Sequence, residues 1–277
     1  MLFIPKLMIK ISHEVPKALL EWSLDVNDYD YILPYFYKRS SDYAAFYQTA
    51  KSNGRFSILD NGLFEGETYS NLELVCLINE LKPDIFIVPD EWNNSDATYK
   101  HAEKWSDLSN KLNLDTDLMI VLQGERFEEM FQLLYKCYQL GYRHFAVNHS
   151  SKAYDSHFQH NNPDVSKMMG RINFINYIQR RSTIPEECYF HLLGCTLPQE
   201  FMYYKGYDFI KSVDTSNPII LGLENILYSQ FGQLVKPDLK MAHYFNWERS
   251  NLGGDEIGDL EMDTIQKNIN TFKQMFL

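Results

Sequence analysis

The sequence predicts a single (β/α)8 barrel that spans residues 1–277. Eight short apolar runs, each the length of a buried strand, alternate with segments whose apolar residues have helical spacing. Eight such units fit the roughly 250 residues that a closed barrel of this kind needs. An open doubly wound sheet is the alternative, but no GxGxxG follows the first run and no GxxxxGKS or GxxxxGKT loop occurs. We therefore expect the closed barrel.

The expected elements follow one another at regular intervals. Residues 71–83 place Leu, Val and Ile on one helical stripe, and residues 126–142 close with Gly141, a residue typical of helix ends. Beyond residue 217 the pattern is less regular, with an exposed loop expected at 250–259 and a final helix at 262–277. The expected strands are 6–12, 31–37, 56–60, 84–90, 118–124, 144–150, 189–194 and 209–214.

The composition is that of a folded globular protein with one large core. The chain is 45% hydrophobic, and no stretch approaches the roughly 20 uncharged apolar residues of a membrane span. The first residues lack the apolar region and cleavage site of a signal peptide, so a cytoplasmic location and no membrane partner are expected. The formal net charge of −11 disfavours indiscriminate nucleic-acid binding but is compatible with a local basic groove.

Polar residues stand at the carboxyl ends of most of the expected strands. In a (β/α)8 barrel those ends surround one mouth, where the active site is assembled. Taken singly, such residues are explained as helix caps or turn formers. Several carboxylates at one mouth favour chemistry instead, because they raise one another's pKa and can divide the roles of acid and nucleophile. The candidate site residues are Asp60, Asn61, Gly62, Phe64, Asp90, Gln123, Gly124, Asn148, His149, Gly194 and Asp214.

Four segments at successive strand ends carry a resemblance to a known family. They are LDNGLFEG (59–66), VPDEW (88–92), VLQGE (121–125) and HLLGCTLPQEFMYYKGYDF (191–209). In order and spacing the series resembles the tRNA-guanine transglycosylases. That family shows D-S-G-G-(F/Y)-Q, D-E-C, V-Q-G and L-(M/A)-G-V-G segments, the last leading to G-x-D-x-F-D. The resemblance covers roughly residues 55–220 and implies an enzyme that exchanges a purine base.

The resemblance assigns roles to individual residues. It implies that Asp60 is the general acid/base for the exchanging base, that Asp90 and Gln123 hydrogen-bond the purine edge, and that Phe64 stacks on it. These assignments suit guanine, because one carboxylate can accept from both N1–H and N2–H while an amide donates to O6. Trp92 is a further aromatic residue expected near the mouth.

The nucleophile of the family does not align without a shift. Counted from Gly206 and Asp208, the nucleophilic aspartate falls on Lys211, which cannot attack an anomeric carbon in its place. Asp214, three residues further on at the expected strand end, is the better candidate. Alternation along the strand puts Lys211 on the face opposite to Asp214.

The floor of the expected base pocket also departs from the family. Gly62 and Gly124 would let the backbone approach the base closely, with an ordinary turn as the alternative role. Asn148 and His149, however, stand where the family has a glycine pair. We expect His149 to donate a hydrogen bond there or to contact ribose or phosphate, and a solvated loop position is the alternative.

The zinc-binding subdomain of the family is missing from this sequence. No cysteine follows Cys195, and the four cysteines, which include Cys76, Cys137 and Cys188, form no CxxC pair. Neither a metal site nor a disulfide framework is therefore expected, and the cysteines should be reduced and mostly buried. The loss makes the chain resemble the compact, phage-type DNA-guanine transglycosylases, which would work in the host cytoplasm.

The expected reaction is base exchange without a cofactor. Asp214 attacks C1′ of the target nucleoside, guanine leaves, and a 7-deazaguanine such as preQ0, deprotonated at N9 by Asp60, displaces the enzyme. The expected partner is DNA, with tRNA as the alternative, and a partner protein or a homodimer is compatible with the sequence. Arg171, Arg180 and Arg181 are the basic residues suggested for the polymer, with a solvated helix face as the alternative.

Two other classes of function stay open at this point. A non-catalytic nucleic-acid-binding or partner subunit would keep the barrel but lose the nucleophile, as Lys211 and the absent zinc site allow. A hydrolase of free nucleosides is favoured by the charge of −11 and would release guanine without an incoming base.

Overall fold

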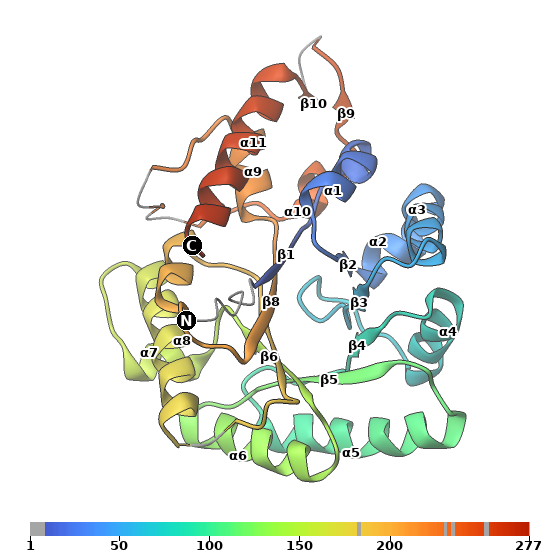
Figure 1. Ribbon diagram of the computed structural model, residues 1–277, viewed down its shortest axis with the longest axis vertical. Coiled ribbons are helices and arrows are strands. Elements are labelled where there is room, and N and C mark those ends of the chain that lie inside the picture. The colour runs from blue at the N-terminus through green and yellow to red at the C-terminus, as the bar shows by residue number, and fades with distance from the viewer. Residues whose placement is uncertain (1–8, 182–183, 230–231, 234–235, 252–254, 277) are drawn as a thin grey trace, which may run out of the picture.

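Eight parallel strands form one sheet that curls into a nearly closed barrel surrounded by helices (Figure 1). The computed structural model describes residues 9–181, 184–229, 232–233, 236–251 and 255–276. The sheet order is β1-β8-β7-β6-β5-β4-β3-β2, which confirms the expected fold class. The strands are β1 (Lys10–His13), β2 (Asp30–Ile32), β3 (Ser57–Leu59), β4 (Ile85–Ile87), β5 (Asp117–Val121), β6 (His144–Asn148), β7 (Tyr189–Leu193) and β8 (Ile210–Thr215).

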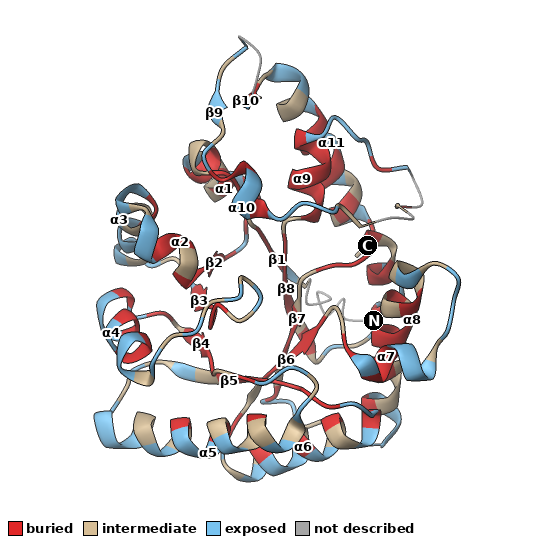
Figure 2. Ribbon diagram, turned by 180° about the vertical axis from the view of Figure 1, so that it is seen from behind, coloured by how far each residue is buried: buried red, intermediate tan, exposed pale blue. Residues whose placement is uncertain are grey.

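Helices surround the barrel, and most of them bury one face and expose the other, whereas α9 is buried throughout (Figure 2). In α4 most of the expected stripe is buried, but Leu72 is exposed and Leu74 takes its place in the core. A capping box of Ser70 and Glu73 starts the helix. The helices are η1 (Lys17–Leu19), α1 (Leu20–Val26), α2 (Pro34–Arg39), α3 (Ser41–Ser52), α4 (Asn71–Leu81), α5 (Ser95–Leu112), α6 (Phe127–Gln139), α7 (Lys152–His157), α8 (Pro163–Arg181), η2 (Pro198–Tyr203), α9 (Asn217–Leu223), α10 (Met241–Tyr244) and α11 (Asp259–Gln274), of which η1 and η2 are 3-10 helices.

Side chains bridge the seam where the barrel closes. β1 and β2 are the two ends of the sheet order, and the Tyr31 N–H donates to Ser12 Oγ at 3.1 Å across this seam. Asn27 binds both backbone groups of His13, accepting from its N–H at 2.7 Å and donating to its carbonyl at 2.9 Å. These bonds satisfy buried backbone groups that a regular ladder would otherwise pair.

The second expected strand, 31–37, is wrong beyond its first residues. β2 ends at Ile32, and Pro34 opens α2, a position that suits proline because its missing N–H would be unpaired there anyway. Both segments are apolar because both are largely buried, so the run of hydrophobic residues did not reveal the change from strand to helix. Residues 6–8 of the first expected strand lie outside the described residues.

The expected loop at 250–259 contains regular structure at its edges. Two short strands, β9 (Glu248–Arg249) and β10 (Glu256–Ile257), pair in parallel, and Ile257 is buried. The final helix, α11, begins at Asp259 rather than at residue 262. Residues 252–254 of this loop lie outside the described residues.

Arg171 is a structural residue, so the suggestion that it contacts a polymer is wrong. Its side chain is fully buried and forms an ion pair with Glu200 of η2. It also donates to the carbonyls of Leu193 and Gly194, both at 2.9 Å, and thereby ties α8 to the end of β7. Sequence periodicity gives no sign of this pair, because its partner lies 29 residues away. Arg180 and Arg181, in contrast, are exposed.

The cysteines are free, as expected for a reduced protein. Cys137, Cys188 and Cys195 are buried, whereas Cys76 is exposed. Within the described residues, every helix is too short or too polar to cross a membrane.

The buried Arg171–Glu200 pair gives a prediction about stability. Glu200→Ala leaves the guanidinium buried without its counter-charge, so the free energy of unfolding should fall by about 3–5 kcal/mol. Urea unfolding of parent and variant measures the difference. Arg180→Ala is the control, because Arg180 is exposed on α8, the helix that carries Arg171. It should change stability by about 0.5 kcal/mol or less. Equal losses in both variants would contradict the structural role of Arg171.

Candidate active site

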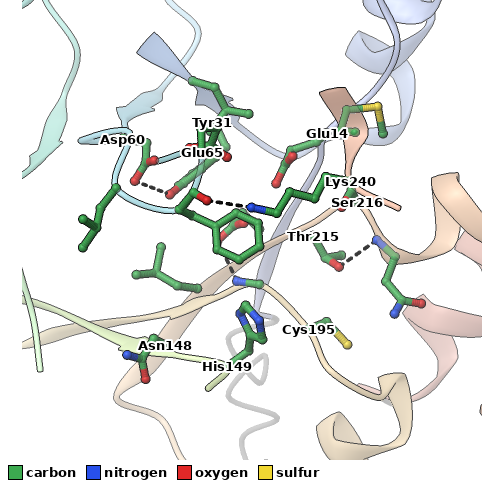
Figure 3. Close-up of a pocket in the computed structure, with 18 of the residues that line it drawn as sticks. Glu14, Tyr31, Asp60, Glu65, Asn148, His149, Cys195, Thr215, Ser216 and Lys240 are labelled. Atoms are coloured by element: carbon green, nitrogen blue, oxygen red, sulfur yellow. Dashed lines mark hydrogen bonds between the residues drawn. The ribbon is translucent and has the colours of Figure 1, made fainter. Parts of the chain in front are cut away.

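A cavity of about 420 Å³ opens at the carboxyl ends of the strands, where the sequence places the candidate site residues. Figure 3 shows residues from opposite sides of the barrel pointing into it. Gly62 and Gly124 do not line it. The other nine candidate residues do: Asp60, Asn61, Phe64, Asp90, Gln123, Asn148, His149, Gly194 and Asp214.

The two glycines outside the lining serve the packing of the protein itself. Gly62 has a left-handed backbone with φ of 82°, and a Cβ there would come within 2.7 Å of the Tyr69 ring. A Cβ at Gly124 would lie 3.0 Å from Cβ of Glu129 and from Cγ of Met130, in the first turn of α6. A side chain at Gly62 would be strained and would clash with the ring, whereas one at Gly124 would require its neighbours to shift by a few tenths of an ångström.

Asp60 follows β3 and is held by two donors. The Tyr31 hydroxyl donates to Oδ1 at 2.9 Å, and the Gly62 N–H donates to Oδ2 at 3.1 Å. Burial raises the pKa of Asp60, and the nearby carboxyl of Asp214 raises it further, against these hydrogen bonds. A raised pKa lets this group carry a proton, as a general acid requires.

Asp90, Gln123 and Asn61 form one hydrogen-bonded group on the cavity wall. Gln123 Nε2 donates to Asp90 Oδ2 at 2.6 Å, and Asn61 Nδ2 donates to Oδ1 at 2.7 Å. Gln123 Oε1 accepts from the Asn93 N–H at 2.9 Å, which fixes the amide orientation. Burial raises the pKa of Asp90 to about 7, even though both amides favour its charged form.

Asp214 lies at the end of β8 with one carboxylate oxygen anchored. His191 Nε2 lies 3.0 Å from Oδ1, and the Gly194 N–H donates to the same oxygen at 3.1 Å. The His191 ring is itself held, because its Nδ1 lies 2.6 Å from Ser212 Oγ. Lys211 lies outside the cavity lining, so the charged residue of β8 that faces the cavity is Asp214.

Two aromatic residues border the cavity. Phe64 is 40% exposed and Trp92 is 42% exposed, so both present ring surface to solvent at the mouth. The Phe64 ring meets His149 edge-on at 5.6 Å between centroids, and the Lys240 ammonium lies 4.0 Å above its centre. His149 is half-buried and lines the cavity, so it is part of the wall rather than a solvated loop group.

Two further carboxyl groups line the cavity that the sequence analysis did not single out. Glu14 follows β1, and burial together with Asp214 holds its pKa well above the usual range. Glu65 lies in the loop after β3, where burial and Asp60 raise its pKa to about 8. Its Oε2 is buried and accepts no hydrogen bond from the described residues. Glu14 was missed because the first expected strand ended at Ser12, two residues short of it.

The arrangement can support acid/base and nucleophilic chemistry together. Several carboxyl groups share one small cavity, and their mutual repulsion keeps some of them protonated near neutral pH. One aspartate has an anchored oxygen and another has a raised pKa, properties that suit a nucleophile and an acid/base group. No protein-family model and no curated protein sequence matches the chain.

The raised pKa of Asp90 makes stability depend on pH. In the unfolded chain this carboxyl has an ordinary pKa of about 3.9, so between about pH 4 and 7 the folded state keeps a proton that the unfolded state has lost. Stability falls as pH rises through that window. Asp90→Asn removes this ionisation. The free energy of unfolding of the variant minus that of the parent should therefore be larger at pH 8 than at pH 4, by on the order of 3 kcal/mol. Urea unfolding at both pH values tests this, and parallel pH profiles would contradict it.

Proposed function

We propose that this protein is a base-exchange glycosyltransferase that replaces guanine in a nucleic acid with a 7-deazaguanine derivative. The observation that carries the proposal is the placement of Asp214 and Asp60 around one cavity, the first with an anchored oxygen and the second with a raised pKa. The Asp90–Gln123 pair on the same cavity wall supports recognition of a guanine-like base. The resemblance to guanine transglycosylases, carried by the motifs around these residues, supports the same reaction.

Base recognition uses groups that the protein has already oriented. Asp90 accepts from N1–H and N2–H of guanine, and the second N–H of Gln123 Nε2 donates to O6. Asn148 adds a donor, because its Nδ2 is buried and has no hydrogen-bond partner among the described residues. Adenine presents an acceptor at N1 and a donor at N6, so it opposes this pattern at both positions.

The exchange proceeds in two displacements. A carboxylate oxygen of Asp214 forms a bond to C1′ as the bond from C1′ to N9 breaks, and the departing guanine takes a proton from Asp60. Asp60, now a carboxylate, removes the N9 proton of the incoming 7-deazaguanine, whose N9 then attacks C1′ and releases Asp214. Two inversions give net retention, as in retaining glycosidases. His191 and the Gly194 N–H keep the nucleophile in place throughout.

DNA is the favoured polymer and tRNA is the alternative. The chain lacks the cysteines of the zinc subdomain found in the tRNA-modifying relatives, which leaves the compact DNA-modifying type as the better match. In either polymer the target base must leave its stack to reach the cavity. Phe64 and Trp92, exposed at the mouth, suit contact with the extruded base or its neighbours.

Label exchange is the direct test of the reaction. The protein is incubated with labelled guanine and either DNA or tRNA, and label in each polymer is counted after removal of free base. We expect label in DNA. Label in tRNA alone would assign the protein to tRNA, and guanine release without any incorporation would favour a nucleoside hydrolase. Tight polymer binding with neither incorporation of label nor release of guanine would indicate a non-catalytic subunit.

Asp214→Asn should abolish exchange and the covalent intermediate while guanine binding is retained. The change removes the negative nucleophile but keeps the size of the side chain. Gel analysis of trapped enzyme–polymer adduct, together with label exchange, measures the effect. Lys211→Ala on the same strand is the control and should retain most activity. Near-normal exchange by the Asp214 variant would show that another residue is the nucleophile.

Asp90→Ala and Gln123→Ala should each weaken binding of free guanine by about 1–3 kcal/mol, since each leaves a buried polar partner unpaired. Calorimetric titration with guanine and adenine measures both affinity and selectivity. Asp96→Ala, at an exposed position of α5, is the control and should bind as the parent does. A parent protein that binds adenine as tightly as guanine would contradict this assignment of the purine edge.

A further inference from the structure

One ammonium group in the cavity wall lacks a counter-ion. Lys236 Nζ lies 2.8 Å from His149 Nε2, and no carboxylate among the described residues lies within 4.0 Å of it. His149 is neutral, because burial and the charge of Lys236 hold its pKa well below the usual range. An ammonium group has only donors, so Nε2 of the neutral ring accepts from the lysine. The largely buried Lys236 ammonium therefore contacts the neutral imidazole of His149.

The nearest carboxylate on this side is already engaged by other donors. Asp164 Oδ2 accepts from the backbone N–H of Lys236 at 2.9 Å, and its Oδ1 lies 4.0 Å from the Lys167 ammonium. Burial lowers the pKa of Lys236, and the charge of Lys167 adds to this. The carboxyls of Asp164 and Glu14 act in the opposite direction, so positive charge on this wall is partly compensated.

A third lysine extends this wall toward the mouth. Lys240 Nζ donates to the Phe64 carbonyl at 2.8 Å and lies 4.0 Å from the centre of the Phe64 ring. The Lys236 ammonium lies 5.6 Å from the same ring centre, so both cations lie near one aromatic ring. Lys167, Lys236 and Lys240 all line the cavity, and we call them the lysine wall.

The cavity lining carries both signs of charge. Carboxyl groups come from Glu14, Asp60, Glu65, Asp90 and Asp214, and the lysine wall lies with neutral His149 and the further carboxyls of Asp164 and Asp238. The three ammonium groups attract an anionic group of a ligand.

We propose that the lysine wall, with Lys236 at its centre, binds the phosphate group attached to the sugar of the target nucleotide. This inference rests on the proposed function and deepens it, since it names the cavity residues that hold the phosphate beside the target sugar. The phosphate belongs either to a free nucleotide or to the backbone of a polymer. In both cases its oxygens accept charge-assisted hydrogen bonds from the lysines. Lys236 gains the counter-ion that the protein does not supply.

Calorimetric binding with three small probes tests the proposal. The parent should bind 2′-deoxyguanosine 5′-monophosphate about tenfold or more tightly than 2′-deoxyguanosine, and it should also bind 2-deoxyribose 5-phosphate. Lys236→Met should remove this preference and leave the affinity for free guanine within about twofold. Lys240→Met should weaken the preference in the same direction, which keeps the test valid if Lys236→Met fails to fold. Lys267→Met, on α11 far from the cavity lining, should behave as the parent does.

The results separate this proposal from the proposed function. Guanine binding with equal affinity for the nucleoside and the nucleotide would overturn the phosphate site and leave base exchange intact. If Lys236→Met loses sugar-phosphate binding, the phosphate site is supported. If the parent protein also fails to bind guanine, base exchange is contradicted. A short oligodeoxynucleotide with one deoxyguanosine distinguishes the sources. Tighter binding than the mononucleotide indicates the polymer backbone, and weaker binding indicates a free nucleotide.

Discussion

Closure of eight parallel strands is the constraint on which the rest of this molecule depends. Parallel strands point the same way, so their carboxyl ends meet at one rim, and every residue that follows a strand competes for the same small space. Asp60, Asp90 and Asp214 come from β3, β4 and β8 and share one cavity for this reason. Closure also creates a seam between β1 and β2 that needs Ser12 and Asn27 to pair the backbone groups there. The carboxylates and the seam are two results of one geometry.

The crowded carboxyls lower the stability of the fold at neutral pH. Burial raises the pKa of Asp90 to about 7 and that of Glu65 to about 8, so ionising either group at the rim opposes folding. The opposite situation is found beneath the rim, where Arg171 and Glu200 are buried as a compensated pair and Arg171 also binds the carbonyls at the end of β7. The fold thus keeps its compensated charges in the supporting layer and its uncompensated charges in the cavity, which is the arrangement expected of a functional site.

The sequence predicted the barrel and most of the cavity because both depend on local patterns. All eight strands were located from apolar runs, and nine of the eleven candidate residues line the cavity, since a residue at a strand end can be placed without knowing any long-range contact. Side-chain partners could not be placed in this way. His191 was inside a quoted motif, but its contact with Asp214 depends on the register between β7 and β8, which contains an irregularity at residues 190 and 191. The burial of Arg171 by Glu200 of η2 depends on a similar long-range contact.

The lysine wall could not be predicted, because two of its three lysines lie in an irregular segment of the chain. Lys236 and Lys240 belong to the irregular chain after β8, where no periodicity fixes a face, yet this segment crosses to the loops after β3 and β6 and bonds to Phe64 and His149. The residues at the strand ends give the cavity mouth mostly carboxyl groups. The segment after β8 adds Lys236 and Lys240 to this lining, and α8 adds Lys167. In the proposed function the strand ends therefore provide the reacting groups, and these lysines provide positive charge for the phosphate.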